Sequence, residues 1–440
     1  MTKLEFYFHS QGGYRYVPHV DETGAPTRTN YVSLPTELYD TQLGGKAIHE
    51  YVDSLAFAER LGFDGILHSE QHGSPIGLSG NALVTAAWLA ARTEHIRIVC
   101  AGPVLNGYLS PVRMAEEIAL VDNLSRGRLS VGLPMGIGPN YHAQGVTNPA
   151  YARERYREAL DLLLAAMTRP GPFEWEGKFF HVPYVNLWPR PVQQPYPEIW
   201  VPVAGSRDSL KLCADRRFVY MILLSPPAVR IKNAQIFREL CEEQGYTPDP
   251  RQTAVCTIVH VAESDRQARR EAEPHILWLF QHVFGGAFPE WFPPGQVSSQ
   301  SLRGMLAGGY RSGDMAAMTF DELSERGWVV VGSPSTVSER LEQLAEEAGA
   351  GRMVIWGDFI SNPDWLLRKS MTLFAEEVIP RFREPDGKPV WARADDRLPR
   401  TNAEWAAVGQ QRATPRVGMP GDGVVDLEAA LAYDSGAEVD

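Results

Sequence analysis

The chain has 440 residues, of which 44% are hydrophobic and 22% charged, proportions typical of a folded globular protein. Its 42 Lys and Arg residues against 54 Asp and Glu give a formal net charge of −12, which argues against binding nucleic acid or an anionic membrane through bulk charge. Four cysteines without a Cys-x-x-Cys pair exclude a disulfide framework and a zinc ribbon, and favour a reducing, cytoplasmic location. No run approaches about 18 uncharged apolar residues, so we expect no membrane-spanning helix.

Short apolar runs alternate with stretches of helical periodicity along most of the chain. The runs that we interpret as strands are, in order, Leu4–Phe8, Phe63–Leu67, Ile96–Ala101, Arg128–Leu133, Ile199–Ala204, Val219–Leu224, Ala254–Val261 and Met353–Trp356. Helical spacing lies between them, for example at residues 48–58, 81–91 and 110–124. Eight strands separated by helices predict an α/β fold, a (β/α)8 TIM barrel with insertions.

Residues 1–382 are expected to form a single barrel domain that carries two inserts. The first insert, 10–45, directly follows the first strand and is rich in Gly, Pro, Thr and Tyr. The second, 284–328, has weak periodicity, and long segments of this kind in compact domains are often lids. Residues 383–440 are polar, rich in Pro and Gly and acidic at their end, so we interpret them as a C-terminal tail.

Several common site motifs are absent from the sequence. There is no GxxxxGK phosphate loop, no GxSxG nucleophile elbow and no HExxH zinc motif. The segment from Gly136 begins like a dinucleotide fingerprint but lacks its last glycine. His68 and His72 are four residues apart, yet no third ligand lies in obvious reach, so we predict no metal site.

Polar residues follow the second predicted strand, in the order His68-Ser69-Glu70-Gln71-His72. Residues at the C-terminal end of a barrel strand point toward the site region. His72 either donates a hydrogen bond to a bound oxygen or acts as a general base, or it only fixes a turn, and the residues alone leave both interpretations open. Glu70 is more often a structural carboxylate in such a place.

The third predicted strand ends in Ala101-Gly102-Pro103. A proline here favours a cis peptide bond, and a glycine lets a flat ligand approach the backbone. An ordinary trans turn is the alternative.

The fifth predicted strand runs through Ala204 and Gly205 into Ser206, where a helix begins. Free N–H groups at a helix N-terminus bind phosphate, although a plain serine N-cap explains the same pattern. Arg153 or Arg155 could complete a phosphate site, with surface ion pairing as the default interpretation.

Aromatic side chains gather in and before the second insert. Two interpretations are open: they enclose an apolar substrate, or they pack the core of a helix pair. These aromatic residues are Trp278, Phe280, Phe284, Phe288, Trp291 and Phe292.

Long blocks in a fixed order resemble the bacterial luciferase-like, flavin-dependent monooxygenases over most of residues 3–382. The blocks are AERLGFDGILHSEQH at 58–72, TEHIRIVCAGPVL at 93–105, PVRMAEEIALVDNLSRGRLSVGLPMG at 111–136, and the segments 183–209 and 332–356. Within the family, the resemblance is closest to the terpenoid and cyclic-ketone members such as the diketocamphane monooxygenases.

The resemblance implies a two-component monooxygenase in a (β/α)8 barrel. Such proteins bind reduced FMN (FMNH2), supplied by a separate flavin reductase, at the C-terminal face of the barrel. O2 adds at flavin C4a, and the resulting (hydro)peroxide delivers one oxygen atom to a small, mostly apolar substrate. Hydroxylation and Baeyer–Villiger insertion are both open. The resemblance also implies a homodimer formed through helices near the second and third strands.

The resemblance further implies roles for single residues. Gln71 and His72 fall on the two histidines of the family's Glu-His-His motif, so they are the candidate catalytic residues, and Gln71 makes light emission unexpected. Met135 replaces an arginine that grips the flavin phosphate in luciferase, so Arg153 or Arg155 would have to compensate. The candidate cofactor-binding residues are Ala101, Gly102 and Pro103, with a cis bond at Gly102-Pro103, then Met135, Gly136 and Arg153, and finally Ala204, Gly205 and Ser206.

Two other functions remain open from the sequence. A deazaflavin-dependent hydride-transfer enzyme shares the barrel and the blocks but usually takes polar substrates, and the aromatic insert favours the monooxygenase. A non-catalytic flavin-binding relative is also possible because Gln71 and Met135 depart from the luciferase pattern.

Overall fold

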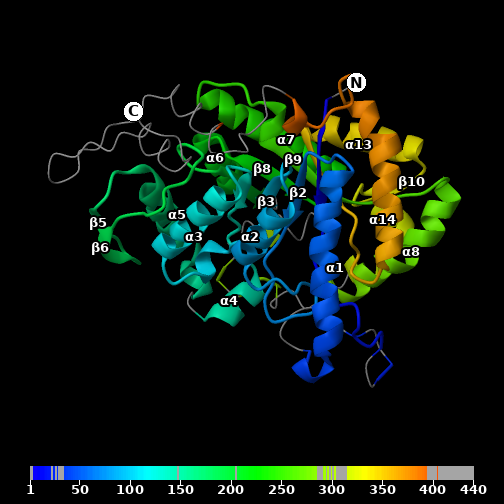
Figure 1. The fold of residues 1–440 in the computed structure, drawn as a ribbon, viewed down its shortest axis with the longest axis horizontal. Coiled ribbons are helices and arrows are strands. Elements are labelled where there is room, and N and C mark those ends of the chain that lie inside the picture. Colours follow the sequence, from blue (N-terminus) through cyan, green and yellow to red (C-terminus); the bar gives the residue numbers. More distant parts are fainter. Residues whose placement is uncertain are drawn as a thin grey trace, which may run out of the picture.

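The computed structural model describes residues 3–20, 23–24, 27, 34–145, 148–203, 206–284, 291–293, 295–296, 299, 302–303, 315–393 and 404. In this part of the chain, parallel strands form a closed barrel surrounded by helices (Figure 1). The eight barrel strands are β1 (Glu5–His9), β2 (Gly65–His68), β3 (Arg97–Cys100), β4 (Leu129–Gly132), β7 (Glu198–Val203), β8 (Val219–Leu223), β9 (Thr253–Val261) and β11 (Arg352–Trp356). They follow one another in chain order, and β9 pairs with both β8 and β11 to close the ring. The predicted (β/α)8 barrel is confirmed.

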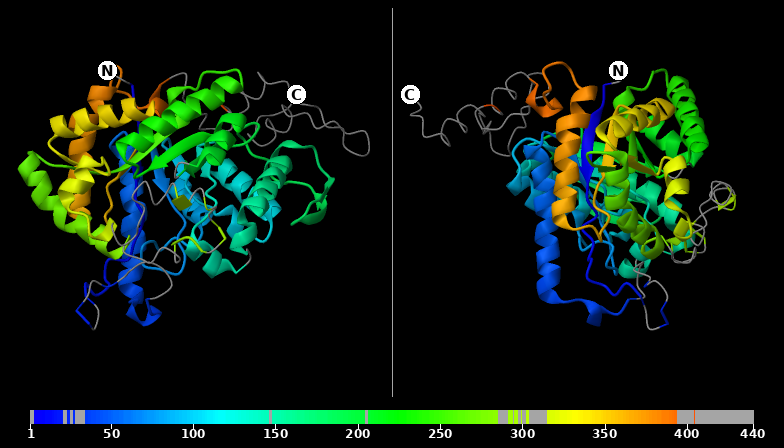
Figure 2. Two further views of the ribbon diagram at one scale, coloured as in Figure 1. Left: turned by 180° about the vertical axis from the view of Figure 1, so that it is seen from behind. Right: turned by 90° about the vertical axis from the view of Figure 1, so that its right-hand side faces the viewer.

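The helices cover the outside of the barrel in all views (Figure 2). They are α1 (Thr41–Arg60), α2 (Ala82–Arg92), α3 (Pro111–Leu124), α4 (Gly138–Gln144), α5 (Ala152–Thr168), α6 (Arg207–Arg216), α7 (Pro227–Glu243), α8 (Asp265–His282), α12 (Phe320–Glu325), α13 (Pro334–Ala348) and α14 (Asp364–Leu373). Shorter helical turns are η1 (Thr36–Leu38), η2 (Leu105–Gly107), η3 (Pro149–Tyr151), η4 (Pro250–Gln252), η5 (Phe374–Val378), η6 (Ile379–Phe382) and η7 (Val390–Ala392). None of the described helices has the length and apolar character needed to cross a bilayer.

Three strands lie outside the predicted set of eight. β10 (Val329–Gly332) pairs in parallel with the C-terminal half of β9, beyond the part of β9 that belongs to the barrel. β5 (Phe173–Glu176) and β6 (His181–Val185) form an antiparallel hairpin at the edge of the molecule (Figure 1). β5 and β6 are partly exposed, so their sequences lack the continuous apolar runs of the barrel strands, whereas β10 does carry a short apolar run, Val329–Val331.

The barrel strands bury both of their faces. Phe6, Phe8 and Ile66 belong to the core between strands and helices, whereas Tyr7 and Leu67 belong to the core inside the barrel. This alternation follows from the two-residue period of a strand. It places every second residue of β1, from Glu5 to His9, on the inside.

A buried ionic cluster closes the N-terminal end of the barrel interior. The Arg352 guanidinium donates from Nε to Glu5 at 2.9 Å and from Nη1 to Glu198 at 2.9 Å. Tyr7 and Trp200 pack above it, with ring centroids 5.1 Å apart. Among the described residues, this cluster fills the N-terminal end of the barrel interior.

Residues 383–393, which the sequence assigns to the tail, lie against the start of β2 rather than apart from the barrel. Arg383 contacts both carboxylate oxygens of buried Asp64 at 3.2 Å, and the Val390 N–H donates to Asp64 Oδ1 at 2.8 Å. Trp391 Nε1 donates to the Phe63 carbonyl at 2.8 Å. The rest of the proposed tail, apart from residue 404, lies outside the described residues, and the division of the chain at residue 382 stays a prediction.

Candidate functional site

The C-terminal ends of β1, β2, β3 and β11 meet at the open end of the barrel, which we call the barrel mouth. His9 lies in register with Leu67 on one side and with Trp356 on the other. Ala101 follows β3 and packs against the interior core. Because active sites of TIM barrels lie at this end, the residues of the mouth and of the loops above it form the candidate site.

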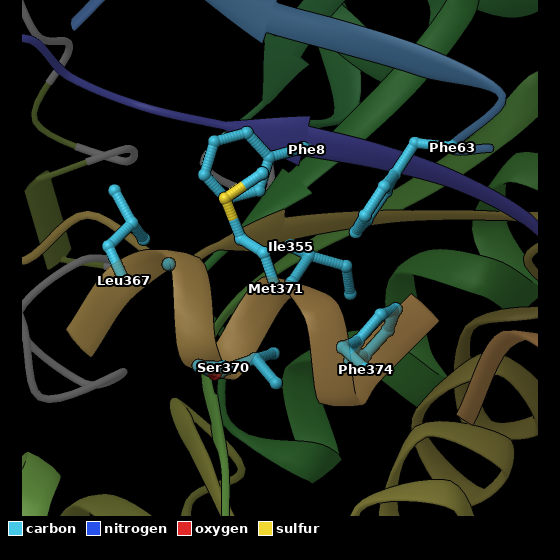
Figure 3. A pocket seen from close by; sticks show the side chains of 9 residues that line it. Phe8, Phe63, Ile355, Leu367, Ser370, Met371 and Phe374 are labelled. Carbon is cyan, nitrogen blue, oxygen red and sulfur yellow. The ribbon is translucent and has the colours of Figure 1, made fainter. Parts of the chain in front are cut away.

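A small cavity elsewhere in the molecule is not this site. It measures about 10 Å³ and lies between the barrel strands and α14, on the helix side of the sheet (Figure 3). Aromatic and aliphatic side chains line it, including Phe8, Phe63 and Phe374. The hydroxyl of Ser370 already accepts a hydrogen bond from the Val261 N–H at 2.9 Å. The cavity is mostly apolar and too small for a ligand, so we interpret it as a packing defect.

The carboxylate of Glu70 connects three segments of the candidate site. Its Oε1 accepts hydrogen bonds from His72 Nε2 at 3.1 Å and from the Val104 N–H at 3.3 Å. Its Oε2 accepts from the Ala82 N–H at the start of α2, at 3.2 Å. Since a carboxylate only accepts, His72 carries its hydrogen on Nε2 in this pair. Glu70 therefore has a structural role, the interpretation that its position in the sequence favoured. It also fixes the orientation of the His72 ring.

The two candidate catalytic residues differ in how they are held. His72 is largely buried and paired with Glu70. The Gln71 side chain instead packs beside Gly77, where an added Cβ would lie 2.5 Å from Gln71 Cγ. The Gln71 N–H donates to the Ser79 carbonyl at 2.9 Å. Their roles stay predictions.

The peptide bond between Gly102 and Pro103 is cis, as the sequence and the resemblance favoured. Gly102 is tightly packed, because a Cβ at this position would lie 2.6 Å from Glu70 Cβ. Gly132, at the end of β4, lies equally close to Ala101, whose Cα is 2.6 Å from the position of an added Cβ. The two glycines let the backbone of 101–103 pack closely against Glu70 and β4, with Gly102 and Pro103 buried and Ala101 partly exposed.

The loop after β4 packs against this segment. A Cβ on Gly136, whose φ is +93°, would lie 2.7 Å from Val104 Cγ1. The Met135 carbonyl accepts hydrogen bonds from Asn106 Nδ2 at 3.2 Å and from the Tyr141 hydroxyl at 2.9 Å. Met135 and Gly136 therefore adjoin the predicted flavin surface through their backbone.

The start of α6 carries the candidate phosphate site. Ser206 is the N-cap, and its Oγ accepts from the Ser209 N–H at 3.3 Å. Arg153 Nη1 donates to Asp208 Oδ2 in the first turn of α6 at 3.3 Å. The structure thus brings an arginine to a capped helix N-terminus, while Ala204 and Gly205 lie outside the described residues.

Arg155 does not reach α6. Its guanidinium donates to the carbonyls of Asn106 at 3.1 Å and Tyr108 at 2.7 Å, and it lies 4.7 Å from the centre of the Phe180 ring. Arg155 therefore holds the loop after β3, and of the two arginines only Arg153 is placed near Ser206.

The predicted aromatic group divides between core and barrel mouth. Trp278 and Phe280 are buried in the interior core. Phe284 stacks on Trp291 with ring centroids 5.8 Å apart, and its ring meets Trp356 of β11 edge to face at 6.5 Å. Phe292 is half-buried, and Phe288 lies outside the described residues. These contacts form an aromatic wall at the end of β11, which consists of Phe284, Trp291 and Trp356.

His9 is a residue of the barrel mouth that the sequence interpretation did not select. Its ring faces inward beside Trp356, with ring centroids 5.3 Å apart, and Nδ1 lies 3.0 Å from the Leu67 carbonyl oxygen. Burial lowers the pKa of His9, although the backbone of Leu67 and the charge of Asp358 raise it in part. The two-residue period of β1 could have identified His9 from the sequence, because it places His9 on the same inward face as Tyr7.

His68 and His72 have different surroundings in the structure. His68 follows the outward phase of Ile66, and neither of its ring nitrogens has a hydrogen-bond partner in the part of the chain that the structure describes. Burial lowers the pKa of His68 to about 3. Across the described ranges, no three His, Cys, Asp or Glu side chains converge in the manner of a metal site.

The sequence matches the family model described as luciferase-like monooxygenase over residues 29–352. The limonene 1,2-monooxygenase of Rhodococcus erythropolis is 25% identical, over 76% of this chain and 82% of that protein. The oxygenase component of the flavin-dependent trigonelline monooxygenase of Acinetobacter baylyi is 29% identical, over 78% of this chain and 92% of that protein.

Two solved structures share the fold. One is the oxygenating constituent of the 3,6-diketocamphane monooxygenase of Pseudomonas putida, a type II Baeyer–Villiger monooxygenase in complex with FMN. It superposes with a TM-score of 0.63 at 21% identity, covering 87% of this chain and 99% of the other. An F420-dependent secondary alcohol dehydrogenase superposes with a TM-score of 0.62 at 15% identity, covering 87% and 100%.

Proposed function

Because the chain belongs to the luciferase-like monooxygenase family, we propose that it is the oxygenase component of a two-component FMN-dependent monooxygenase. A separate flavin reductase would supply reduced FMN, and the enzyme would use O2 to oxygenate a small, mostly apolar substrate. The observation that carries the proposal is the close packing of Gly102 on Glu70 at the barrel mouth, which places the Glu70–His72 pair directly beside residues 101–103.

The residues present fit an FMN molecule. The resemblance places the flavin ring against residues 101–103, and the close packing of Gly102 on Glu70 holds this segment at the barrel mouth. Ser206 at the start of α6, together with Arg153, offers N–H groups, a hydroxyl and a positive charge for the phosphate. Bound reduced FMN would supply the electrons that activate O2.

The side chains of this protein would orient the reactants and exclude water. The aromatic wall of Phe284, Trp291 and Trp356 offers an apolar surface beside the mouth for the substrate. His72, oriented by Glu70, would hold or move a proton near the flavin surface.

A deazaflavin-dependent oxidoreductase is the second candidate. The F420-dependent alcohol dehydrogenase has the same fold, and a phosphate site at α6 would serve either cofactor. The aromatic wall favours the monooxygenase, because apolar rings offer few partners to a polar substrate. A chain that binds flavin without catalysis is the third outcome, kept open by Gln71 and Met135.

We further propose that the chain forms a homodimer through α2 and α3. Val84 on α2 and Leu120 and Leu124 on α3 are exposed, and Leu109 just before α3 is 79% exposed. Leu120 and Leu124 are one helical turn apart, and burying such exposed apolar side chains would favour association of two copies. The cytoplasmic location stays a prediction from the cysteine content.

The direct test is protection of reduced flavin. The protein is loaded anaerobically with reduced FMN and mixed with aerated buffer while flavin absorbance is followed. The proposal predicts that bound flavin reoxidises more slowly than free flavin. Gly102→Ala should weaken flavin binding, because its Cβ would lie 2.6 Å from Glu70 Cβ, whereas a Cβ on Gly80 would have 3.9 Å to its nearest atom. Gly80→Ala is therefore the matched control. Equal reoxidation of bound and free flavin would contradict the proposal.

A further inference from the structure

Gln296 is a buried residue of the second insert whose side chain reaches the loop after β4. It is only 2% exposed, and its Nε2 donates a hydrogen bond to the Gly136 carbonyl at 2.6 Å. The two residues are 160 positions apart in the chain. The contact therefore joins the second insert to the segment that adjoins the predicted flavin surface.

The neighbours of Gln296 in the chain contact the start of α5. Gly295 has a φ of +93°, and a Cβ at this position would lie 3.1 Å from the Cα of Ala150. The Gln296 N–H donates to the carbonyl of buried Pro293 at 3.1 Å. Ala150 belongs to η3, which leads directly into α5 and Arg153. The insert thus contacts both the loop after β4 and the start of the helix that carries Arg153.

Side chains hold two successive carbonyls of the loop after β4. The Met135 carbonyl accepts hydrogen bonds from the Tyr141 hydroxyl at 2.9 Å and from Asn106 Nδ2 at 3.2 Å. The next carbonyl, that of Gly136, accepts from Gln296. Because a peptide group is planar, fixing the direction of two successive carbonyls fixes the path of the backbone between them. Gln296 supplies the part of this restraint that comes from the second insert.

The Tyr141 hydroxyl relates Gln296 to the candidate phosphate site. Burial raises the pKa of Tyr141 to about 12, whereas a hydrogen bond from Asn106, the positive charge of Arg153 and a hydrogen bond from Gln296 lower it in part. Arg153 is the arginine that the structure places at the start of α6, near Ser206. Gln296 therefore attaches the insert on the phosphate side of the predicted flavin surface.

We infer that Gln296 is a positioning residue for the flavin, which fixes the loop after β4 through its hydrogen bond to Gly136 and so strengthens binding of the phosphate end. It acts through the loop, and no contact between Gln296 and the flavin is required. The inference rests on the proposed function, since it concerns the cofactor of that same site. It gives the second insert two roles, because Trp291 of the same insert belongs to the aromatic wall on the substrate side.

The test compares the affinities for reduced FMN and reduced riboflavin in anaerobic titrations of the full-length protein. Gln296→Met keeps a side chain of similar length but has no donor for the Gly136 carbonyl. We expect it to weaken the binding of reduced FMN about fivefold, the worth of about one hydrogen bond, and that of reduced riboflavin less than about twofold. A residue that only supports the fold would not distinguish the two flavins.

The matched control is Gln193→Met. Gln193 Nε2 also donates to a backbone carbonyl, that of Leu129, at 2.6 Å, but at the opposite end of β4. The control should leave both affinities unchanged. Gln296→Asn keeps the amide but shortens the side chain by one methylene, so that the donor is drawn away from Gly136. It should act in the same direction as Gln296→Met and keeps the test valid if that variant fails to fold.

A second readout needs no flavin. Hydrogen exchange in the ligand-free protein, followed by mass spectrometry, should be faster over residues 135–141 in Gln296→Met than in the wild type. The Gln193→Met control should leave exchange over this segment unchanged. This comparison reports directly on whether Gln296 fixes the loop after β4.

Three results would overturn the inference: unchanged exchange over residues 135–141 in the folded Gln296 variants, unchanged affinity for reduced FMN, or equal losses of affinity for the two flavins. Wild-type protein that binds reduced FMN while the Gln296 variants bind it equally well removes only this inference. Wild-type protein that binds no reduced flavin removes the proposed function and this inference together.

Discussion

Replacing Glu70 by Gln tests whether one carboxylate holds the site together. The carboxylate accepts three hydrogen bonds, from His72, Val104 and the first N–H of α2 at Ala82. A glutamine of the same shape keeps one acceptor oxygen and places an NH2 group where the other oxygen was. In the better orientation the oxygen keeps His72 and Val104, and the NH2 group faces the Ala82 N–H, so one backbone donor loses its partner.

The cost follows from these contacts. An unpaired buried donor costs about 1–3 kcal/mol, and losing a negative charge at a helix N-terminus costs about 0.3–1 kcal/mol more. We therefore expect Glu70→Gln to lower the free energy of unfolding by about 2–3 kcal/mol, measured by urea denaturation. Flavin affinity should change far less, because the glutamine keeps the Cβ that packs on Gly102.

The control is Glu116→Gln on α3. The carboxylate of Glu116 is half-exposed and forms an exposed ion pair with Arg113 at 3.5 Å. Such a pair contributes little, so its loss should cost less than about 0.5 kcal/mol. The reasoning about Glu70 is refuted if Glu70→Gln is as stable as the control, or if it loses flavin binding while remaining folded.

Three further predictions concern the phosphate site, the interface and a buried histidine. Arg153→Gln should weaken the binding of reduced FMN more than that of reduced riboflavin in anaerobic titrations, and equal losses of affinity for both flavins would place the phosphate elsewhere. Arg155→Gln should mainly lower the unfolding temperature. The double change Leu120→Glu and Leu124→Glu should turn a dimer into a monomer in sedimentation velocity, and an unchanged dimer would exclude this face. His68 has a folded pKa of about 3 against 6.5 unfolded, so the unfolded chain binds more protons between these values and stability should fall with decreasing pH by up to about 1.4 kcal/mol per unit. His68→Leu should make that slope shallower in urea denaturation at pH 5–7, while other buried histidines such as His9 still contribute. An identical slope would show that His68 does not contribute.

The barrel could be predicted from the sequence because strand and helix periods alternate clearly, and each strand is buried on both faces. β10 was missed although it has an apolar run, because the eight barrel strands already complete the pattern and β10 only extends β9 outside the ring. The hairpin of β5 and β6 was missed for a different reason, because partly exposed strands carry a weak apolar pattern. Local composition therefore predicts the strands of the barrel but not the strands at the periphery.

The candidate site was predictable where chain neighbours define it. The cis bond at Gly102-Pro103 and the N-cap at Ser206 are local features that the sequence marks by residue type. The choice between Arg153 and Arg155 depends on which of two side chains, two residues apart on α5, faces α6 or the loop after β3. The place of His9 depends on the inward phase of β1 and on its neighbours in β2 and β11, which only the assembled barrel brings together.

The central claim is that the barrel mouth binds reduced FMN. The most direct measurement is an anaerobic titration of the wild-type protein with photoreduced FMN and, in parallel, with reduced deazaflavin. The account predicts saturable binding of reduced FMN, at least tenfold tighter than that of the deazaflavin. Preference for the deazaflavin would move the protein to the hydride-transfer enzymes, and binding of neither cofactor would contradict the flavin site itself.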